Sequence, residues 1–131
     1  MPLHRCCKVV AFDTNVLVAV ERKKADVFSM ARRLFGKSVR FVVTEQVKEE
    51  LCQLGERGKS MERSVKVAKE VLKKEDVKVI GIKARDADAS LLEAAKQGFC
   101  VATNDRRLRK RIKKLGGAII YLRGNRLLES G

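Results

Sequence analysis

The chain has 131 residues, 45% of them hydrophobic, which is enough for one domain with an ordinary core, and we expect a single domain over residues 1–131. Its 30 Lys and Arg against 16 Asp and Glu give a formal net charge of +14, which favours nucleic acid as the partner, ahead of an acidic protein or a membrane surface. No apolar run approaches the ~20 residues of a membrane span, and the first residues lack the apolar core of a secretory signal, so we expect a soluble cytoplasmic protein.

Short apolar runs alternate with longer amphipathic stretches along the chain, which is typical of a parallel sheet with helices on its faces. Five strands are predicted, at residues 8–12, 40–43, 77–82, 99–103 and 118–122. Six helices are predicted between them, at residues 14–21, 25–35, 44–54, 60–75, 85–97 and 105–115. Residues 55–60 are the most linker-like segment, and the tail from Arg123 onward is too short to assign. The expected fold class is α/β.

The first predicted strand, KVVAF at residues 8–12, runs directly into Asp13. A carboxylate at the end of a buried strand is costly to desolvate unless it is paired or binds a cation. In open α/β sheets, ligands bind beyond the carboxyl ends of the strands, so this position makes Asp13 a candidate site residue. The alternative is that Asp13, Thr14 or Asn15 only caps the following helix.

The predicted helix at residues 44–54 carries an apolar stripe made of Val47, Leu51 and Leu54. At 100° per residue, Glu50 falls at the border of this stripe, roughly 60° from Val47, while the other acids of the helix face water. Glu50 is therefore the acid of this helix that could reach a cleft at the edge of the core. A Glu beside a core stripe is also common on ordinary surfaces.

The predicted helix at residues 85–97 places Asp88 inside the apolar sector that Leu91 and Ala95 define. An Asp on the core side of a helix start points to function. Asp86 points away from this sector and is explained as a first-turn acid that the helix dipole favours. If Asp86 were the functional acid instead, the third position of the site would move by two residues.

The predicted strand at residues 99–103 repeats the pattern of the first strand, because an apolar run leads straight into Thr103, Asn104 and Asp105. Asp105 is therefore a fourth candidate. The structural alternative is that Asn104 is the N-cap of the next helix and Asp105 a first-turn acid.

Four acids are thus predicted at one edge of the sheet: Asp13, Glu50, Asp88 and Asp105. They would repel one another unless a cation joined them, and hard oxygen donors without His or thiolate select magnesium or manganese over zinc. Such an ion polarises phosphoryl oxygens and generates hydroxide near neutral pH. In a strongly basic protein this favours hydrolysis of a phosphodiester.

The segment after Asp105 holds seven Lys and Arg in the nine positions 106–114. Its buried stripe is predicted to consist of Leu108, Ile112 and Leu115. Cations late in a helix also stabilise the helix dipole, but seven exceed what the dipole requires. We expect contacts with a nucleic-acid phosphate backbone from the side chains of Arg106, Arg107, Lys110, Arg111 and Lys114.

Four segments in this order, VVAFDTNVLV, VTEQVKEEL, DADASLLEAA and VATND, resemble the acidic signatures of PIN-domain ribonucleases. The resemblance spans residues 8 to about 122, and its first and last motifs are the specific ones. It implies a three-layer α/β/α fold around a parallel sheet of about five strands, metal-dependent cleavage of RNA with Mg²⁺ or Mn²⁺, and frequently a homodimer. Carried over residue by residue, it places the metal-binding acids at Asp13, Glu50, Asp88 and Asp105. It also matches three supporting polar residues: Asn15, Thr103 and Asn104.

The predicted function is that of an endoribonuclease whose four acids hold one or two ions. Asp13 and Asp105 are expected to be the strongest ligands and Asp88 the next, while Glu50 acts through water or as the base. The basic helix and the VTEQVKEELCQLG segment look closest to archaeal and eukaryotic PIN proteins that process pre-ribosomal RNA. Toxins of toxin–antitoxin pairs share the four acids, and that type would bring an antitoxin partner.

Two rival functions come from other classes of protein. A non-catalytic RNA-binding or ribosome-assembly protein would keep the fold and show salt-sensitive RNA binding without metal-stimulated cleavage. A phosphatase with an aspartyl nucleophile is disfavoured, because its motif wants a second Asp where Asn15 stands.

The four cysteines, Cys6, Cys7, Cys52 and Cys100, form no CxxC pair, which argues against a zinc ribbon. A metal cluster of His4 with Cys6 and Cys7 is disfavoured, because adjacent cysteines rarely bind one tetrahedral ion. The thiols are expected to be reduced in an ordinary cytosol. The high Lys, Arg and Glu content would also suit a heat-adapted source, where intracellular disulfides occur.

Overall fold

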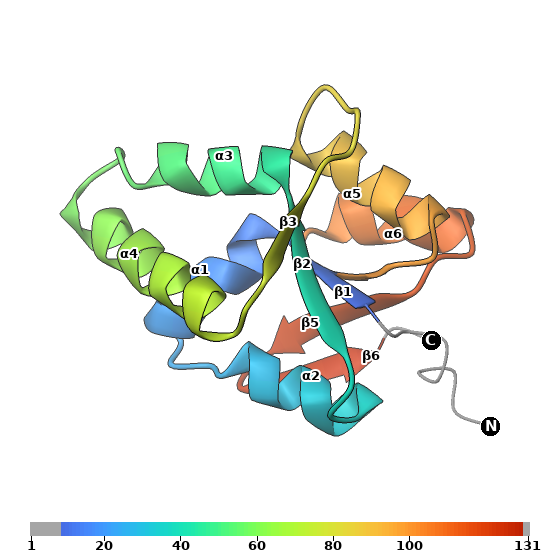
Figure 1. The fold of residues 1–131 in the computed structure, drawn as a ribbon, viewed down its shortest axis with the longest axis horizontal. Coiled ribbons are helices and arrows are strands. Elements are labelled where there is room, and N and C mark those ends of the chain that lie inside the picture. Colours follow the sequence, from blue (N-terminus) through green and yellow to red (C-terminus); the bar gives the residue numbers. More distant parts are fainter. Residues whose placement is uncertain (1–8, 130–131) are drawn as a thin grey trace.

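The structure is a computed structural model in which residues 9–129 are described (Figure 1). The strands within this range are β1 (Val9–Phe12), β2 (Arg40–Thr44), β3 (Lys78–Ile80), β4 (Cys100–Ala102), β5 (Ile119–Arg123) and β6 (Arg126–Glu129). The helices are α1 (Thr14–Arg22), α2 (Val27–Phe35), α3 (Glu45–Leu54), α4 (Lys59–Lys74), α5 (Ala87–Lys96) and α6 (Arg106–Lys114). The predicted elements are thus all present, with ends that shift by a few residues. The disfavoured metal cluster of His4, Cys6 and Cys7 lies outside the described residues.

The strands form one sheet in the order β3-β2-β1-β4-β5-β6. The first five strands of this order run parallel to one another. The register places Val10 of β1 beside Phe41 of β2 on one side and Cys100 of β4 on the other. β1 therefore lies between β2 and β4, and the carboxyl ends of all three strands meet at one edge. This edge receives Asp13 from β1 and the polar cluster that follows β4.

The centre of the sheet is covered on both faces, which explains the unbroken apolar runs in the sequence. Val10, Ala11 and Phe12 of β1 are fully buried. Figure 1 shows α1, α2 and α4 on one side of the sheet and α5 and α6 on the other, while α3 runs along the carboxyl edge. The predicted three-layer α/β/α architecture is confirmed.

The sheet has one strand more than the five that were predicted, because the tail after Arg123 returns as β6. β6 runs antiparallel to β5, with Arg123 opposite Arg126, so the two strands are joined by a two-residue turn of Gly124 and Asn125. Gly124 has a φ of +60°, which such a tight hairpin turn requires and which glycine adopts without strain. Leu127 of β6 is buried, and this burial holds the extra strand against the core.

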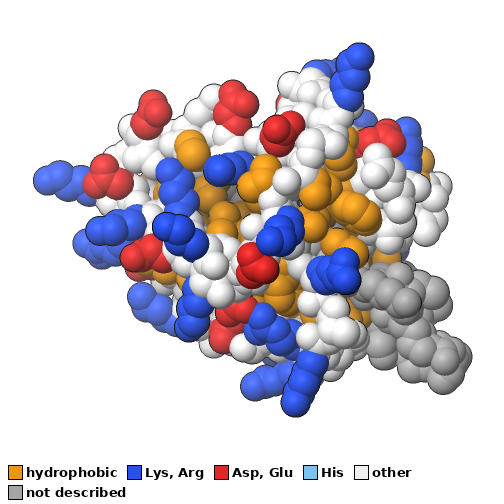
Figure 2. Space-filling model, viewed as in Figure 1, with side chains coloured by type: hydrophobic (Ala, Val, Ile, Leu, Met, Phe, Trp, Pro, Cys, Tyr) orange, Lys and Arg blue, Asp and Glu red, His pale blue; other side chains and the backbone are white. Residues whose placement is uncertain are grey.

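The face around α4, β2 and β3 is rich in cations (Figure 2). α4 buries Val65 and Ala68 against the core and exposes six basic side chains to solvent: Lys59, Arg63, Lys66, Lys69, Lys73 and Lys74. Cys52 is exposed and Cys100 is buried. Within residues 9–129, every helix is too short or too polar to cross a bilayer.

Candidate functional site

The four predicted acids line one cleft of about 340 Å³ beyond the carboxyl ends of β1 and β4. Each acid comes from a different part of the chain, at the end of β1, in α3, in α5 and at the start of α6. The lining residues are Asp13, Thr14, Asn15, Val18, Glu50, Gln53, Leu54, Arg57, Asp88 and Asp105. The structure therefore brings together residues that are up to 92 positions apart in the sequence.

Asp13 is the most deeply placed acid of the cleft, with only 4% of its surface exposed. One carboxylate oxygen accepts the Thr14 N–H at 2.8 Å, and the other accepts the Thr103 hydroxyl at 2.6 Å and the Asn15 side-chain amide at 3.3 Å. Asp13 is also the N-cap of α1, so capping and placement in the cleft coexist. Asp13 is therefore both a helix cap and a candidate site residue.

Burial raises the pKa of Asp13 from 3.8 to about 6. The hydrogen bonds from Thr103 and Thr14 pull this pKa down, while the negative charges of Glu50 and Asp88 push it further up. The carboxylate therefore lies in a negative environment that disfavours its own ionised form.

Glu50 lies on α3 at the border of the buried stripe, as the helical phase predicts. Val47 and Leu51 of the same helix are fully buried, whereas the Glu50 residue is exposed. Its carboxylate accepts a hydrogen bond from the Thr14 hydroxyl. Thr14 thereby ties Glu50 to the residue that follows Asp13.

Asp88 lies in the first turn of α5, lines the cleft and is exposed. The prediction that it falls inside the apolar sector is wrong, because its side chain lines the open cleft, whereas Ala87 and Ser90 of the same turn are buried. Leu91 and Ala95, further along α5, are buried as expected. Partial burial is the main cause that raises the pKa of Asp88, and the negative charges of Asp105, Asp86 and Glu50 raise it further. The positive charge of the Arg111 guanidinium lowers it.

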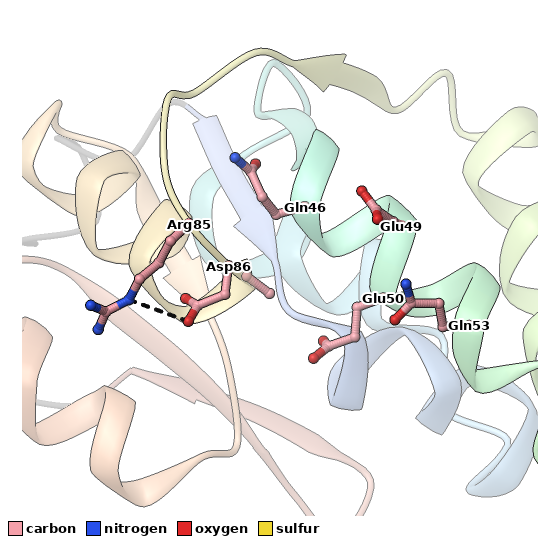
Figure 3. A pocket seen from close by; sticks show the side chains of 7 residues that line it. Gln46, Glu49, Glu50, Gln53, Arg85 and Asp86 are labelled. Carbon is pink, nitrogen blue, oxygen red and sulfur yellow. Dashed lines mark ion pairs between the residues drawn. The ribbon is translucent and has the colours of Figure 1, made fainter.

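Asp86 is the N-cap of α5 rather than a first-turn acid, since its side chain accepts the Ala89 N–H at 2.8 Å. It lines a neighbouring pocket of about 210 Å³ together with Gln46, Glu49, Glu50, Gln53, Arg85 and Ala87. Figure 3 shows Asp86 and Glu50 on facing sides of this pocket, with Arg85 paired to Asp86. The four-acid cleft is lined by Asp88 and not by Asp86.

The loop before α5 is fastened to α3 by one side chain. The Gln46 amide donates to the backbone carbonyls of Ile82 at 2.6 Å and Ala84 at 3.0 Å. These bonds fix where α5 begins, and therefore where Asp88 lies.

Asp105 is the N-cap of α6, because its carboxylate accepts the backbone N–H groups of Arg107 at 2.9 Å and Leu108 at 3.2 Å. The prediction that Asn104 would be this cap is wrong. Asn104 pairs with β5 instead: its amide donates to the Leu122 carbonyl at 2.9 Å, and its oxygen accepts the Leu122 N–H at 2.8 Å. An amide side chain can do both at once and so extends the β4–β5 pairing, which a carboxylate cannot do.

Thr103 connects the two acids that follow the strands. Its buried hydroxyl donates to Asp13 and accepts the Asp105 N–H at 3.1 Å. The Asn15 side-chain oxygen accepts the Asn104 N–H at 3.1 Å, which joins the same two segments a second time. Thr103, Asn104 and Asn15 thus hold the ends of β1 and β4 in a fixed relation.

The chemistry of this donor set fits a hard divalent cation. Within residues 9–129, no group of three or more His, Cys, Asp and Glu side chains is arranged to hold a metal ion as it stands. Over the same range, none of the four acids takes part in an ion pair. Oxygen ligands that repel one another and lack a cationic partner match Mg²⁺ or Mn²⁺, which water helps to coordinate.

α6 carries the predicted basic surface. Its residues Leu108 and Ile112 are buried, whereas all five cations predicted to contact RNA are exposed: Arg106, Arg107, Lys110, Arg111 and Lys114. Leu115 was predicted to be buried and is 47% exposed, because α6 ends at Lys114 and the chain turns away from the stripe. Arg109 has a structural role, with its guanidinium 4.3 Å from the centre of the Tyr121 ring.

Comparisons with known proteins agree with this architecture. The PIN like domain family matches residues 10–125, and the chain therefore belongs to this family, as the four acidic segments predicted. Ribonuclease VapC9 from Archaeoglobus fulgidus is 38% identical over 120 residues, which cover 89% of this chain and 83% of that protein.

Two solved structures share the fold. The PIN domain endonuclease Utp24 superposes with a TM-score of 0.77 and 24% identity, covering 93% of this chain and 90% of that one. A domain of a functionally unknown protein from Methanocaldococcus jannaschii superposes with a TM-score of 0.63 and 19% identity, covering 89% and 92%.

Proposed function

We propose that this protein is a divalent-metal-dependent endoribonuclease that hydrolyses phosphodiester bonds in RNA. The observation that carries the proposal is a cleft with four carboxylates that lack a cationic partner among residues 9–129, next to a helix that exposes cations. Membership of the PIN-like family and the 38% identity to a ribonuclease support it. We further propose that residues 1–131 form one such nuclease domain.

The four acids are the proposed metal ligands, with Asp13 and Asp105 the strongest and Asp88 next. A bound Mg²⁺ or Mn²⁺ polarises phosphoryl oxygens and makes water nucleophilic near neutral pH. Glu50 acts through water or as the base, and the Thr14 hydroxyl orients its carboxylate for this role. The Thr103 hydroxyl orients Asp13 and also engages the backbone of Asp105.

The exposed cations of α6 are the proposed contacts with the RNA backbone. They lie on the helix that Asp105 caps, so a strand bound along α6 passes the acidic cleft. Contacts of this kind are independent of base sequence and weaken as salt rises.

The proposed biological setting is RNA processing in the cytoplasm, with ribosomal RNA precursors as the substrate and a homodimer as the assembly. The alternative is a toxin of a toxin–antitoxin pair. Ribonuclease VapC9, at 38% identity, supports the ribonuclease activity that both settings share. Copurification of the protein with the product of a small adjacent gene would identify the toxin type.

The test is cleavage of a labelled single-stranded RNA by the purified protein. Cleavage is expected with Mg²⁺ or Mn²⁺, should stop with EDTA, and should fall at least ~100-fold in Asp13→Asn, since even residues that only orient metal ligands contribute 10–100-fold. Circular dichroism checks that the variant is folded. Salt-sensitive RNA binding without metal-stimulated cleavage would instead identify the non-catalytic RNA-binding protein.

A further inference from the structure

Arg57 stands apart from the other residues of the acidic cleft. It lies in the turn between α3 and α4, and it is the single Lys or Arg among the residues that line the cleft. The α6 cations are absent from this lining, although the Arg111 charge reaches Asp88. A cation thus borders the acids on the side formed by α3.

Turn hydrogen bonds hold the backbone of Arg57 in place, whereas its guanidinium is left available to a ligand by the residues that the structure describes. Three successive turn hydrogen bonds extend α3, and the last of them joins the Arg57 N–H to the Leu54 carbonyl at 3.1 Å. Within residues 9–129, no ion pair and no side-chain hydrogen bond involves the Arg57 guanidinium. The guanidinium of Arg32, in contrast, pairs with Glu75.

The cleft needs such a cation if it is to accept a phosphodiester. Four carboxylates repel the substrate, and one divalent ion would offset only half of their charge. The cations of α6 lie outside the lining of the cleft, and among them the Arg111 charge reaches Asp88. Arg57 is the side chain that adds positive charge inside the cleft without displacing a carboxylate.

The two sources of positive charge lie on different sides of the acids. Figure 1 shows α5 beside the start of α3 with α6 beyond it, whereas the α3–α4 turn with Arg57 follows the other end of α3. An RNA strand held by both would have its reacting phosphate between them, above the carboxylates. A guanidinium suits this position because its fork of N–H groups matches two phosphate oxygens.

We infer that Arg57 binds a phosphate of the RNA inside the cleft, on the side away from α6, and so fixes the strand at the acids. The inference rests on the proposed ribonuclease function and names a substrate contact that the basic helix does not supply. The competing explanation is that Arg57 only neutralises the carboxylates when no ion is bound.

The test compares Arg57→Ala and Arg57→Lys with Lys59→Ala as the matched control. Lys59 is an exposed cation two positions away that does not line the cleft. RNA affinity is measured by fluorescence anisotropy in an Asp13→Asn background with Mg²⁺, which keeps the RNA intact. We expect Arg57→Ala to weaken binding about tenfold, Arg57→Lys to lie between, and Lys59→Ala to change it less than about twofold.

A second arm locates the phosphate. The cleavage site of a short RNA is mapped, and one linkage at a time around it is replaced by an uncharged methylphosphonate. If Arg57 contacts that phosphate, the effect of Arg57→Ala on binding disappears with one of these RNAs and persists with the others. The Lys59→Ala effect should be the same with all of them.

The outcomes separate the inference from the proposed function. Equal losses for Arg57→Ala and Lys59→Ala would overturn the inference, and so would an unchanged RNA affinity combined with tighter Mn²⁺ binding in a calorimetric titration. A parent protein that binds RNA but never cleaves it would overturn the proposed nuclease, while a selective loss in Arg57→Ala would still support the phosphate contact.

Discussion

The two edges of the sheet differ in a way that shows what marks a site. At the amino ends of the strands there is a larger pocket of about 520 Å³, lined by the starts of β1, β2 and β3 and by Phe41 and Phe99. Both acids that line it are paired: Arg32 binds Glu75 and stacks 5.1 Å from the Phe41 ring centre, and Lys78 lies 3.2 Å from Asp76.

The carboxyl edge has the smaller cleft of about 340 Å³, but its acids lack cationic partners within the described residues. Burial raises the pKa values of Asp13 and Asp88, and neighbouring carboxylates raise them further. Volume alone would select the wrong edge. Carboxylates held together without neutralisation are what distinguish the candidate site, because the fold gains nothing from their repulsion.

The largest difference between the edges should appear when one acid is neutralised at each. Asp88→Asn at the cleft is expected to lower RNA cleavage at least ~100-fold, because it removes a proposed metal ligand. Asp76→Asn at the opposite edge should leave cleavage within about twofold, since it breaks only an exposed ion pair. Single-turnover cleavage rates at saturating Mg²⁺ measure both, and equal effects would contradict the comparison.

A smaller loss of cleavage is expected when the acids are kept but the hydrogen bonds that position them are removed. Thr103→Val removes the hydroxyl that donates to Asp13 and leaves the Asp105 N–H without its acceptor. Cleavage and Mn²⁺ affinity should fall ~10–100-fold. Thr103→Ser keeps the hydroxyl and should restore most of both, which separates the hydrogen bonds from a packing defect.

The raised pKa of Asp13 should also make the free energy of unfolding depend on pH. This pKa is raised in the folded state from 3.8 to about 6, so the stability that protonated Asp13 contributes is complete below about pH 4 and is lost as pH rises through 6. The loss amounts to ~3 kcal/mol at pH 7, from 1.36 kcal/mol for each pKa unit. About 2 kcal/mol of this loss falls between pH 4.5 and pH 7, and urea unfolding in EDTA at these two pH values measures it.

Asp13→Asn is the control for this measurement, because other carboxyl groups make the protein less stable as the pH falls, which is opposite to the effect of Asp13. Hydrogen bonds lower the pKa values of Glu21, through Ser64, and of Asp26, through Ser29, so their contributions are lost as pH falls. The difference between parent and Asp13→Asn isolates one group. A difference that does not change with pH would show that Asp13 is not destabilised by its surroundings.

The smallest effects are expected for substitutions in the ion pairs at the amino ends of the strands. Arg32→Met removes the ion pair with Glu75 and the stacking on Phe41, and it should lower the free energy of unfolding by about 1 kcal/mol with cleavage unchanged. Lys78→Met, which breaks a fully exposed pair, should change stability by less than about 0.5 kcal/mol. A loss of cleavage in either variant would contradict the assignment of function to the carboxyl edge.

Much of the architecture could be predicted because its signals are local. The apolar runs give the parallel strands, and an acid directly after such a run marks Asp13 and Asp105. Helical phase places Glu50 correctly at the border of the apolar stripe. It also selects Asp88 for the cleft, although this side chain is exposed and not inside the apolar sector.

The predictions fail at residues whose positions depend on contacts with distant parts of the chain. Asn104 leaves its expected capping role because β5 offers it two backbone partners. Leu115 is exposed because helix α6 ends one residue earlier. Arg57 comes from a linker-like segment, where no periodicity indicates the direction of a side chain. The turn of Gly124 and Asn125 did carry a hairpin signal, but the tail was too short for it to be used.

The central position of β1, paired with β4 across the middle of the sheet, also governs when activity can arise. Asp105 and the strand β4 that positions it are synthesised after Asp13, because they lie about 90 residues further along the chain. The four acids therefore come together only after β4 has paired with β1, so the cleft is completed by a late step of folding and not by a local one.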